Sequence, residues 1–216
     1  GKTYTGNMTL KADTTIKNVN FDGKGYDGYA ITTRGANYLT IEDCTAKNYG
    51  YGFVQTASGT ALTTVKNVTV SNMNYGIKVD YSNAVVLENV DITVGVAAVL
   101  NSNYGGKTIT IKNSKLESEG NYAFWVHNYT EADFGTSYNK DTVEKRLNFD
   151  IFNRNNTFVA KTAAVRLGFT NSIKLDANGE DLNAQDNIML LSITTRLGLN
   201  VNGLKFLGSK TSAKIE

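Results

Sequence analysis

Proline is absent from this chain of 216 residues, and cysteine, histidine and tryptophan each occur only once. A single cysteine excludes an intrachain disulfide framework, and we expect Cys44 to be a small buried apolar residue. One cysteine and one histidine also supply too few ligands for a zinc site, and no thiol–imidazole pair for nucleophilic catalysis is expected. The sequence therefore predicts no metal, no cofactor and no catalytic residue.

Clusters of one charge and long apolar runs are missing as well. The 22 basic and 20 acidic residues are scattered and give a formal net charge of +2, which argues against a nucleic-acid partner. No apolar run approaches the roughly 20 residues of a membrane-spanning helix. The segment Gly1 to Tyr4 does not have the pattern of a signal peptide, so we infer the location of the protein from other features.

What the sequence does contain is an internal repeat. Segments of alternating apolar and polar residues recur along the chain. In each segment an aliphatic residue, called the anchor below, stands two positions before an Asn or Asp, which we expect at the corner between two strands. The anchors are Ile16, Ile41, Val65, Leu87, Ile111 and Ile151, at spacings of 25, 24, 22, 24 and 40 residues. A second element, a small residue followed by an apolar one, keeps the same phase, and its apolar positions are Ile31, Phe53, Ile77, Val99, Phe124 and Val165.

The period of these repeats predicts the fold. Each repeat holds only short alternating runs bounded by Asn, Gly, Ser and Asp, which is the pattern of strands. So short a unit cannot bury its own apolar face, and successive copies must stack. We predict an all-β fold, a single-stranded right-handed parallel β-helix (solenoid) of about eight to nine coils of 22–25 residues, forming one domain over residues 1–216.

Two further columns support stacked coils. Asparagine tolerates the left-handed conformation of a corner, and its amide can bond the equivalent amide of the next coil. The predicted ladder consists of Asn18, Asp43, Asn67, Asn89, Asn113 and Asn153. The position before each corner alternates in charge sign, which predicts ion pairs between coils. These residues are Lys17, Glu42, Lys66, Glu88 and Lys112.

The repeats resemble the parallel β-helix repeat of the pectate-lyase-like superfamily, in which an apolar–x–Asn corner precedes a Tyr-Gly-Ile type strand. The segment Asn74-Tyr75-Gly76-Ile77-Lys78-Val79 matches this pattern, and the resemblance is clear over residues 14 to 167. It implies the β-helix fold. It also implies a possible activity on polysaccharides. Enzymes of this superfamily cut them with calcium-binding carboxylates and a Lys or Arg base, or with paired Asp residues that act as acid and base. The Asn-Thr-Asp, Asp-Asp and Gly-His-Gly pattern of polygalacturonases is absent here.

One interruption breaks the repeat, within His127 to Arg146, and about 15 extra residues leave the solenoid there. We therefore expect an inserted loop at about 127–146, with a short helix beginning at Asp141, and capping coils after about residue 172. Alternation places Trp125 and His127 on the outer face. Long insertions often bind ligands, and the candidate ligand-binding residues are Trp125, His127, Tyr129, Glu131, Asp133 and Tyr138. The alternative is that the loop only shields Trp125.

Three functions remain open from the sequence. The first is a non-catalytic, adhesin-like module of a larger bacterial protein, extracellular or at the cell surface, that contacts a polysaccharide or a host or cell-surface glycan. The second is a polysaccharide lyase or glycoside hydrolase of the pectate-lyase-like fold. The third is a structural or self-associating spacer. The missing catalytic patterns favour the first.

Overall fold

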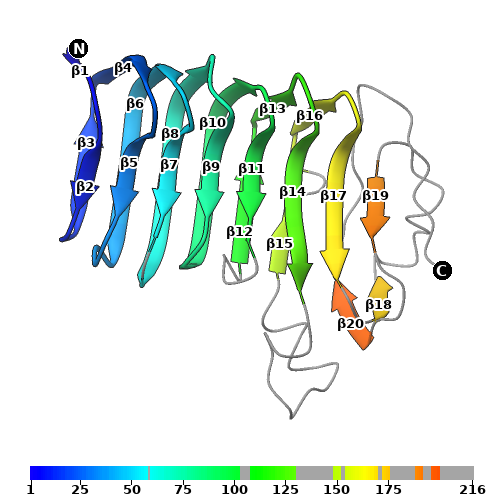
Figure 1. The fold of residues 1–216 in the computed structure, drawn as a ribbon. Helices are drawn as coiled ribbons and strands as arrows, with labels where there is room; N and C mark the ends of the chain where they lie inside the picture. Colours follow the sequence, from blue (N-terminus) through cyan, green and yellow to red (C-terminus); the bar gives the residue numbers. More distant parts are fainter. Residues whose placement is uncertain are drawn as a thin grey trace.

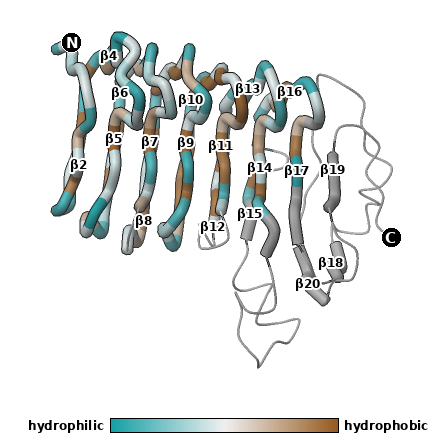
Figure 2. Tube along the Cα trace, viewed as in Figure 1, coloured by the Kyte–Doolittle hydropathy of each residue, from teal (hydrophilic) through white to brown (hydrophobic). Residues whose placement is uncertain are grey.

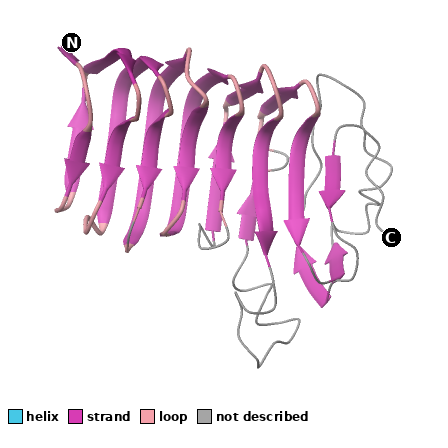
Figure 3. Ribbon diagram, in the orientation of Figure 1, coloured by secondary structure: helices cyan, strands magenta, loops and turns pink. Residues whose placement is uncertain are grey.

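In a computed structural model the chain forms a parallel β-solenoid (Figure 1). The structure describes residues 1–57, 59–102, 108–129, 148–151, 154–169, 172–175, 188–191 and 196–199. Within these residues every regular element is a strand, short loops join the strands (Figure 3), and all strand pairs are parallel. The predicted all-β, parallel solenoid is therefore confirmed.

Two long sheets form the walls of the solenoid. The first contains β1 (Lys2–Tyr4), β3 (Thr14–Lys17), β4 (Val19–Tyr26), β6 (Tyr38–Tyr49), β8 (Thr60–Ser71), β10 (Ser82–Val94), β12 (Thr108–Lys112), β13 (Lys115–Ser118), β15 (Asn148–Asp150) and β16 (Thr157–Ala160). The second contains β2 (Met8–Leu10), β5 (Tyr29–Thr33), β7 (Gly52–Thr56), β9 (Tyr75–Val79), β11 (Ala97–Asn101), β14 (Tyr122–Tyr129), β17 (Ala163–Phe169) and β19 (Ile188–Leu191). A separate pair is formed by β18 (Ser172–Leu175) and β20 (Arg196–Leu199).

The number of turns differs slightly from the prediction. The structure makes about five turns over the part of the chain that it describes most fully, whereas eight to nine coils are predicted over residues 1–216. The predicted helix start at Asp141, most of the predicted loop at 127–146 and most of the predicted capping coils after residue 172 lie outside the described residues.

The anchor residues line the core, as predicted. Register places Ile16, Ile41, Val65, Leu87 and Ile111 opposite one another in successive coils, and all five are buried. Figure 2 shows hydrophobic residues recurring at matching heights along the strands. The predicted inward positions Phe124 and Val126 are fully buried, and so is the lone thiol of Cys44.

One assignment in the second core column was wrong by a single position. Ile31 pairs with Val54, and Val54 with Ile77, so Val54 rather than Phe53 belongs to this column. Phe53 takes the preceding small-residue position, where its ring meets that of Phe21 at 5.6 Å. In the next coil this position is Gly76, where a Cβ would lie 2.4 Å from the carbonyl oxygen of Ala98. Gly76 therefore has no room for a side chain, whereas Phe53 is fully buried in the core, as predicted.

The corner residues adopt the left-handed conformation, with φ between 50° and 56° at Asn18, Asp43, Asn67, Asn89, Asn113 and Asn155. Asn67 Nδ2 donates to Asp43 Oδ1 at 2.9 Å, and Asn89 Nδ2 donates to Asn67 Oδ1 at 3.2 Å. In the last of these coils the bond to Asn113 Oδ1 comes from Asn155, at 3.2 Å. The predicted Asn153 lies outside the described residues.

The shift from Asn153 to Asn155 has a visible cause. Thr108 pairs with Asn148, an offset of 40 residues, whereas Lys115 pairs with Thr157, an offset of 42. Two additional residues therefore enter this coil at its corner, and the ladder position moves by two.

A second ladder runs along another corner. Asn72 Nδ2 donates to Asn48 Oδ1 at 2.6 Å, and Asn48 Nδ2 donates to Asp22 Oδ1 at 2.9 Å. Asn48 and Asn72 also have positive φ. The sequence reading missed this ladder because it spans only three coils and no aliphatic anchor of the repeat precedes it at fixed spacing.

Two of the four neighbouring pairs in the column of alternating charges form ion pairs, so this prediction is confirmed in part. Lys17 Nζ lies 2.5 Å from Glu42 Oε2, and Lys66 Nζ lies 3.2 Å from Glu88 Oε2. We expect Lys66→Glu to lower the free energy of unfolding by about 0.2–1 kcal/mol for each like-charged neighbour that it creates. Urea denaturation measures this loss, and Lys66→Gln, which creates no like-charged neighbour, should lose less. Equal stability of all three proteins would show that these pairs do not contribute.

Candidate functional site

The candidate site lies on the outer face of the second sheet. Register aligns one outward residue from each of five strands, namely Gln55, Lys78, Leu100, Trp125 and Arg166. Their neighbours in the chain, such as Val54, Ile77, Val99 and Phe124, point into the core. The alternation of a strand therefore places polar, aromatic and charged side chains side by side on the surface.

A groove with a volume of about 540 Å³ crosses this face. Strand β9 and the turn after it, β11 and β14 supply its lining, which consists of Tyr75, Lys78, Asp80, Tyr81, Leu100, Ser102, Trp125 and His127. The groove therefore combines aromatic rings and a leucine with hydroxyl, carboxylate, ammonium and imidazole groups. This mixture of apolar walls and a few placed polar groups is typical of small-molecule and sugar sites.

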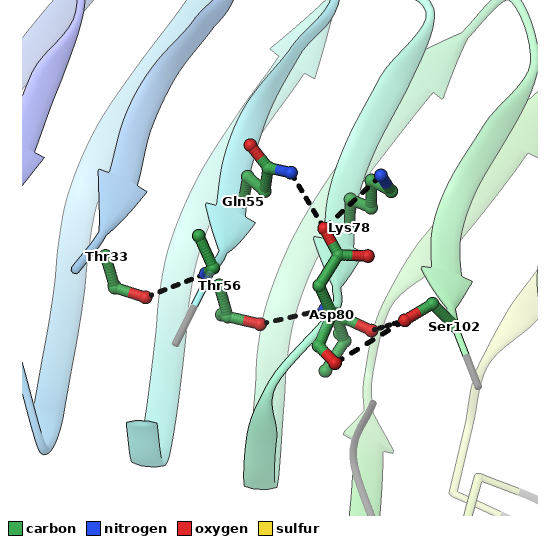
Figure 4. Close-up of polar contacts among 8 residues, drawn as sticks. Thr33, Gln55, Thr56, Lys78, Asp80 and Ser102 are labelled. Carbon is green, nitrogen blue, oxygen red and sulfur yellow. Dashed lines mark hydrogen bonds and ion pairs between the residues drawn. The ribbon is translucent and has the colours of Figure 1, made fainter. Parts of the chain in front are cut away.

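Asp80 is held firmly at one end of the groove. Its Oδ2 accepts a hydrogen bond from Gln55 Nε2 at 2.7 Å and lies 3.3 Å from Lys78 Nζ, as Figure 4 shows. The backbone N–H of Asp80 donates to Thr56 Oγ1 at 3.2 Å, and Ser102 Oγ lies 3.5 Å from its carbonyl oxygen. Both the backbone and one carboxylate oxygen are therefore fixed, so the orientation of the carboxylate is set before any ligand arrives.

The contacts of Gln55 and Lys78 go to Oδ2 of this carboxylate and not to its other oxygen, Oδ1. Asp80 Oδ1 has no hydrogen-bond donor within the described ranges, and Figure 4 shows it on the side of Asp80 that faces β11. An ionised carboxylate is an acceptor only, with room for further donors. Asp80 is thus ready to accept a hydrogen bond from a hydroxyl or amide group of a ligand.

Aromatic rings gather at the other end of the groove. The ring of Trp125 lies 5.1 Å from that of Tyr122 and 6.0 Å from that of His127, measured between centroids. The guanidinium carbon of Arg166 lies 5.0 Å from the centroid of Trp125. Trp125 is partly buried and His127 is exposed. Both point away from the core.

The negative charge of Asp80 also affects Tyr29, which does not line the groove. Burial is the main cause that raises the pKa of the Tyr29 phenol above its ordinary value, and the negative charge of Asp80 raises it further. Tyr29 therefore stays a neutral hydroxyl over the physiological pH range. The charged groups of this end of the groove are Lys78 and Asp80, which neutralise each other.

The structure separates the candidate residues predicted from the sequence into two groups. Trp125 and His127 line the groove together. Tyr129 ends β14, but its side chain, like Glu131, Asp133 and Tyr138, lies outside what the structure describes. The other lining residues were not among the predicted site residues, and only coil-by-coil register could have found them. They are Tyr75, Lys78, Asp80, Tyr81, Leu100 and Ser102.

The part of the chain that the structure describes contains no group of three or more His, Cys, Asp or Glu side chains arranged to hold a metal ion. None of its elements is a helix of the length and apolarity needed to cross a membrane.

Comparison with known proteins identifies the family. The model of the family described as "right handed beta helix region" matches residues 6–188. The chain therefore belongs to this family, which agrees with its fold and with the resemblance noted in its repeats. No curated protein and no solved structure gave a match.

Proposed function

We propose that this right-handed β-helix protein is a saccharide-binding module, and that the groove between Asp80 and Trp125 is its binding site. One observation supports this most directly. A preorganised acceptor, Asp80, and an aromatic platform, Trp125, lie in one groove, two coils apart, with β11 between them. Sugar rings have apolar faces that pack on aromatic rings and hydroxyl groups at their edges that need oriented polar partners.

Binding without catalysis is the form of this function that we favour. Glycoside hydrolysis by an acid–base pair uses two carboxylates on either side of the bond that breaks. The described lining of the groove contains the carboxylate of Asp80, and Gln55 and Lys78 hold it from one side. This arrangement suits a hydroxyl acceptor. Because polysaccharides and surface glycans lie outside cells, we further propose an adhesin-like role outside the cell or at its surface.

Replacing Trp125 with alanine is the first test. We expect the variant to bind linear oligosaccharides at least about tenfold more weakly, equivalent to about 1.4 kcal/mol, because the apolar platform is lost. Isothermal titration calorimetry against a panel of neutral and acidic oligosaccharides measures this, since the variant has no tryptophan fluorescence. Because the ring is partly buried and contacts Tyr122 and Arg166, we also expect a lower melting temperature, and Trp125→Phe is the milder companion variant.

The matched control is Tyr38→Ala. Tyr38 is an exposed aromatic residue, 56% accessible, on β6 of the other sheet. Its loss should leave saccharide binding unchanged. Equal binding by wild type and Trp125→Ala would contradict the proposed site, and a wild-type protein that binds no member of the panel would contradict the proposed function.

A further inference from the structure

Strand β11 forms the floor of the groove, because its outer side chains are smaller than those of the strands on either side. Two rows of register partners cross β9, β11 and β14, namely Tyr75, Ala97 and Tyr122, and Lys78, Leu100 and Trp125. The middle residues, Ala97 and Leu100, are buried but do not belong to the core cluster. They therefore face outward beneath their larger neighbours, and β9 and β14 form the walls.

The groove is closed on the side where these strands begin. Ala97 stands at the start of β11 and is completely inaccessible to solvent. Its register partners are Tyr75, which lines the groove, and Tyr122, whose ring lies 5.1 Å from that of Trp125 between centroids. The tyrosine side chains are much larger than the alanine between them and cover it. The accessible floor therefore ends at this row.

The opposite side of the groove is accessible. Asp80, Ser102 and His127 each follow directly after one of three residues that are paired in register, so they lie level with one another. His127 is exposed, and Tyr81, next to Asp80, is 47% accessible. All four residues line the groove. A ligand that enters here passes polar groups first and reaches the ring of Trp125 behind them.

Packed side chains also bound the groove along the axis of the solenoid. On the β9 side, Asp80 Oδ2 lies 2.7 Å from Gln55 Nε2 and 3.3 Å from Lys78 Nζ. On the β14 side, the guanidinium carbon of Arg166, one coil further on, lies 5.0 Å from the ring centroid of Trp125. A ligand that ran along the axis would have to cross both of these groups. The accessible path is therefore the one along β11.

We infer that the groove receives the terminal ring of a saccharide chain, that the chain enters along β11 from the side of His127, and that Leu100 sets how deeply it enters. The inference rests on the proposed function. The terminal ring packs on Trp125, and the chain leaves past Asp80, whose Oδ1 accepts a hydrogen bond from a sugar hydroxyl. An internal ring has a neighbour on both sides, and one of these would meet the closed row at Ala97.

The first experiment compares chain ends with chain interiors. Calorimetry measures binding of the protein to tetragalacturonate, maltotetraose and xylotetraose, and to a soluble polymer of each sugar, with the ligand counted as sugar units. A longer chain still has only one terminal ring of each kind. A polymer about ten times longer than the tetrasaccharide should therefore bind about tenfold more weakly per sugar unit, with one protein per chain. A site for internal rings would bind the polymer at least as tightly.

The second experiment fills the floor of the groove. Leu100→Trp places a large ring between β9 and β14 and leaves Asp80 and Trp125 unchanged. We expect this variant to bind the tetrasaccharide at least about tenfold more weakly, because the terminal ring no longer fits, and Leu100→Phe to lose less. The matched control is Thr64→Trp, the same replacement at a partly buried position on the outer face of β8 in the other sheet. It should bind like the wild type, and circular dichroism monitors the folding of all three variants.

The possible results separate the inference from the proposed function. A polymer that binds as tightly as its tetrasaccharide, or more tightly, per sugar unit would overturn the inference and leave the proposed function standing. Unchanged or tighter binding by a folded Leu100→Trp would overturn it as well. The polymer comparison uses the unmodified protein, so it decides even where Leu100→Trp does not fold. Failure of these saccharides and of the wider panel to bind the wild type would instead remove the proposed function itself.

Discussion

Leu87→Ala is expected to lower the free energy of unfolding by about 2–5 kcal/mol. Leu87 is fully buried and pairs in register with Val65 on one side and Ile111 on the other. Truncation removes its transfer free energy and leaves a cavity between two coils that cannot close, because their backbones are hydrogen bonded in fixed register. Denaturation in urea, followed by far-UV circular dichroism, measures the change.

Val86→Ala is the matched control on the same strand. Val86 is adjacent to Leu87 but points to the other face of β10 and is only partly buried. We expect its truncation to cost much less than that of Leu87. Similar losses for the two variants would mean that the outer face of β10 is as tightly packed as the core, and the assignment of Leu87 to the core column would lose its energetic support.

Asn67→Ala should lower the free energy of unfolding by about 1–3 kcal/mol, for two separable reasons. Asn67 has a φ of 52°, a conformation that alanine adopts at a cost. It also donates to Asp43 and accepts from Asn89, and both bonds disappear. Because these side chains are exposed, water replaces part of the loss, so we expect the backbone to contribute at least as much as the ladder.

Asn67→Gly separates the two contributions. Glycine adopts positive φ without strain, so this variant loses only the ladder bonds. We expect its stability to lie between those of the wild type and Asn67→Ala in the same urea experiment. If the glycine variant is as unstable as the alanine variant, the ladder carries the whole effect. If alanine is tolerated like asparagine, neither the ladder nor the left-handed corner stabilises this coil.

The candidate site was less accessible to sequence reasoning than the fold. Trp125 and His127 attracted attention because each is the only residue of its kind and both adjoin the interruption of the repeat. No local feature distinguishes Lys78 and Asp80, since a Lys and an Asp two positions apart are common at the end of a strand. Arg166 was not singled out either, because its contacts with Trp125 and Tyr122 depend on tertiary packing that no local pattern contains.

The repeat period, the anchors of the core, the left-handed corners and the alternating charges could all be predicted from the sequence. These features are local patterns that recur with the period, so stacking of the coils brings most of them over their equivalents. The remaining positions depend on the tertiary structure, because the offsets between coils are not constant. Lys78, Leu100, Trp125 and Arg166 become neighbours through offsets of 22, 25 and 41 residues. A slip of one position turns a side chain from the core to the surface, and the exchange of Phe53 for Val54 shows that spacing alone does not fix the register.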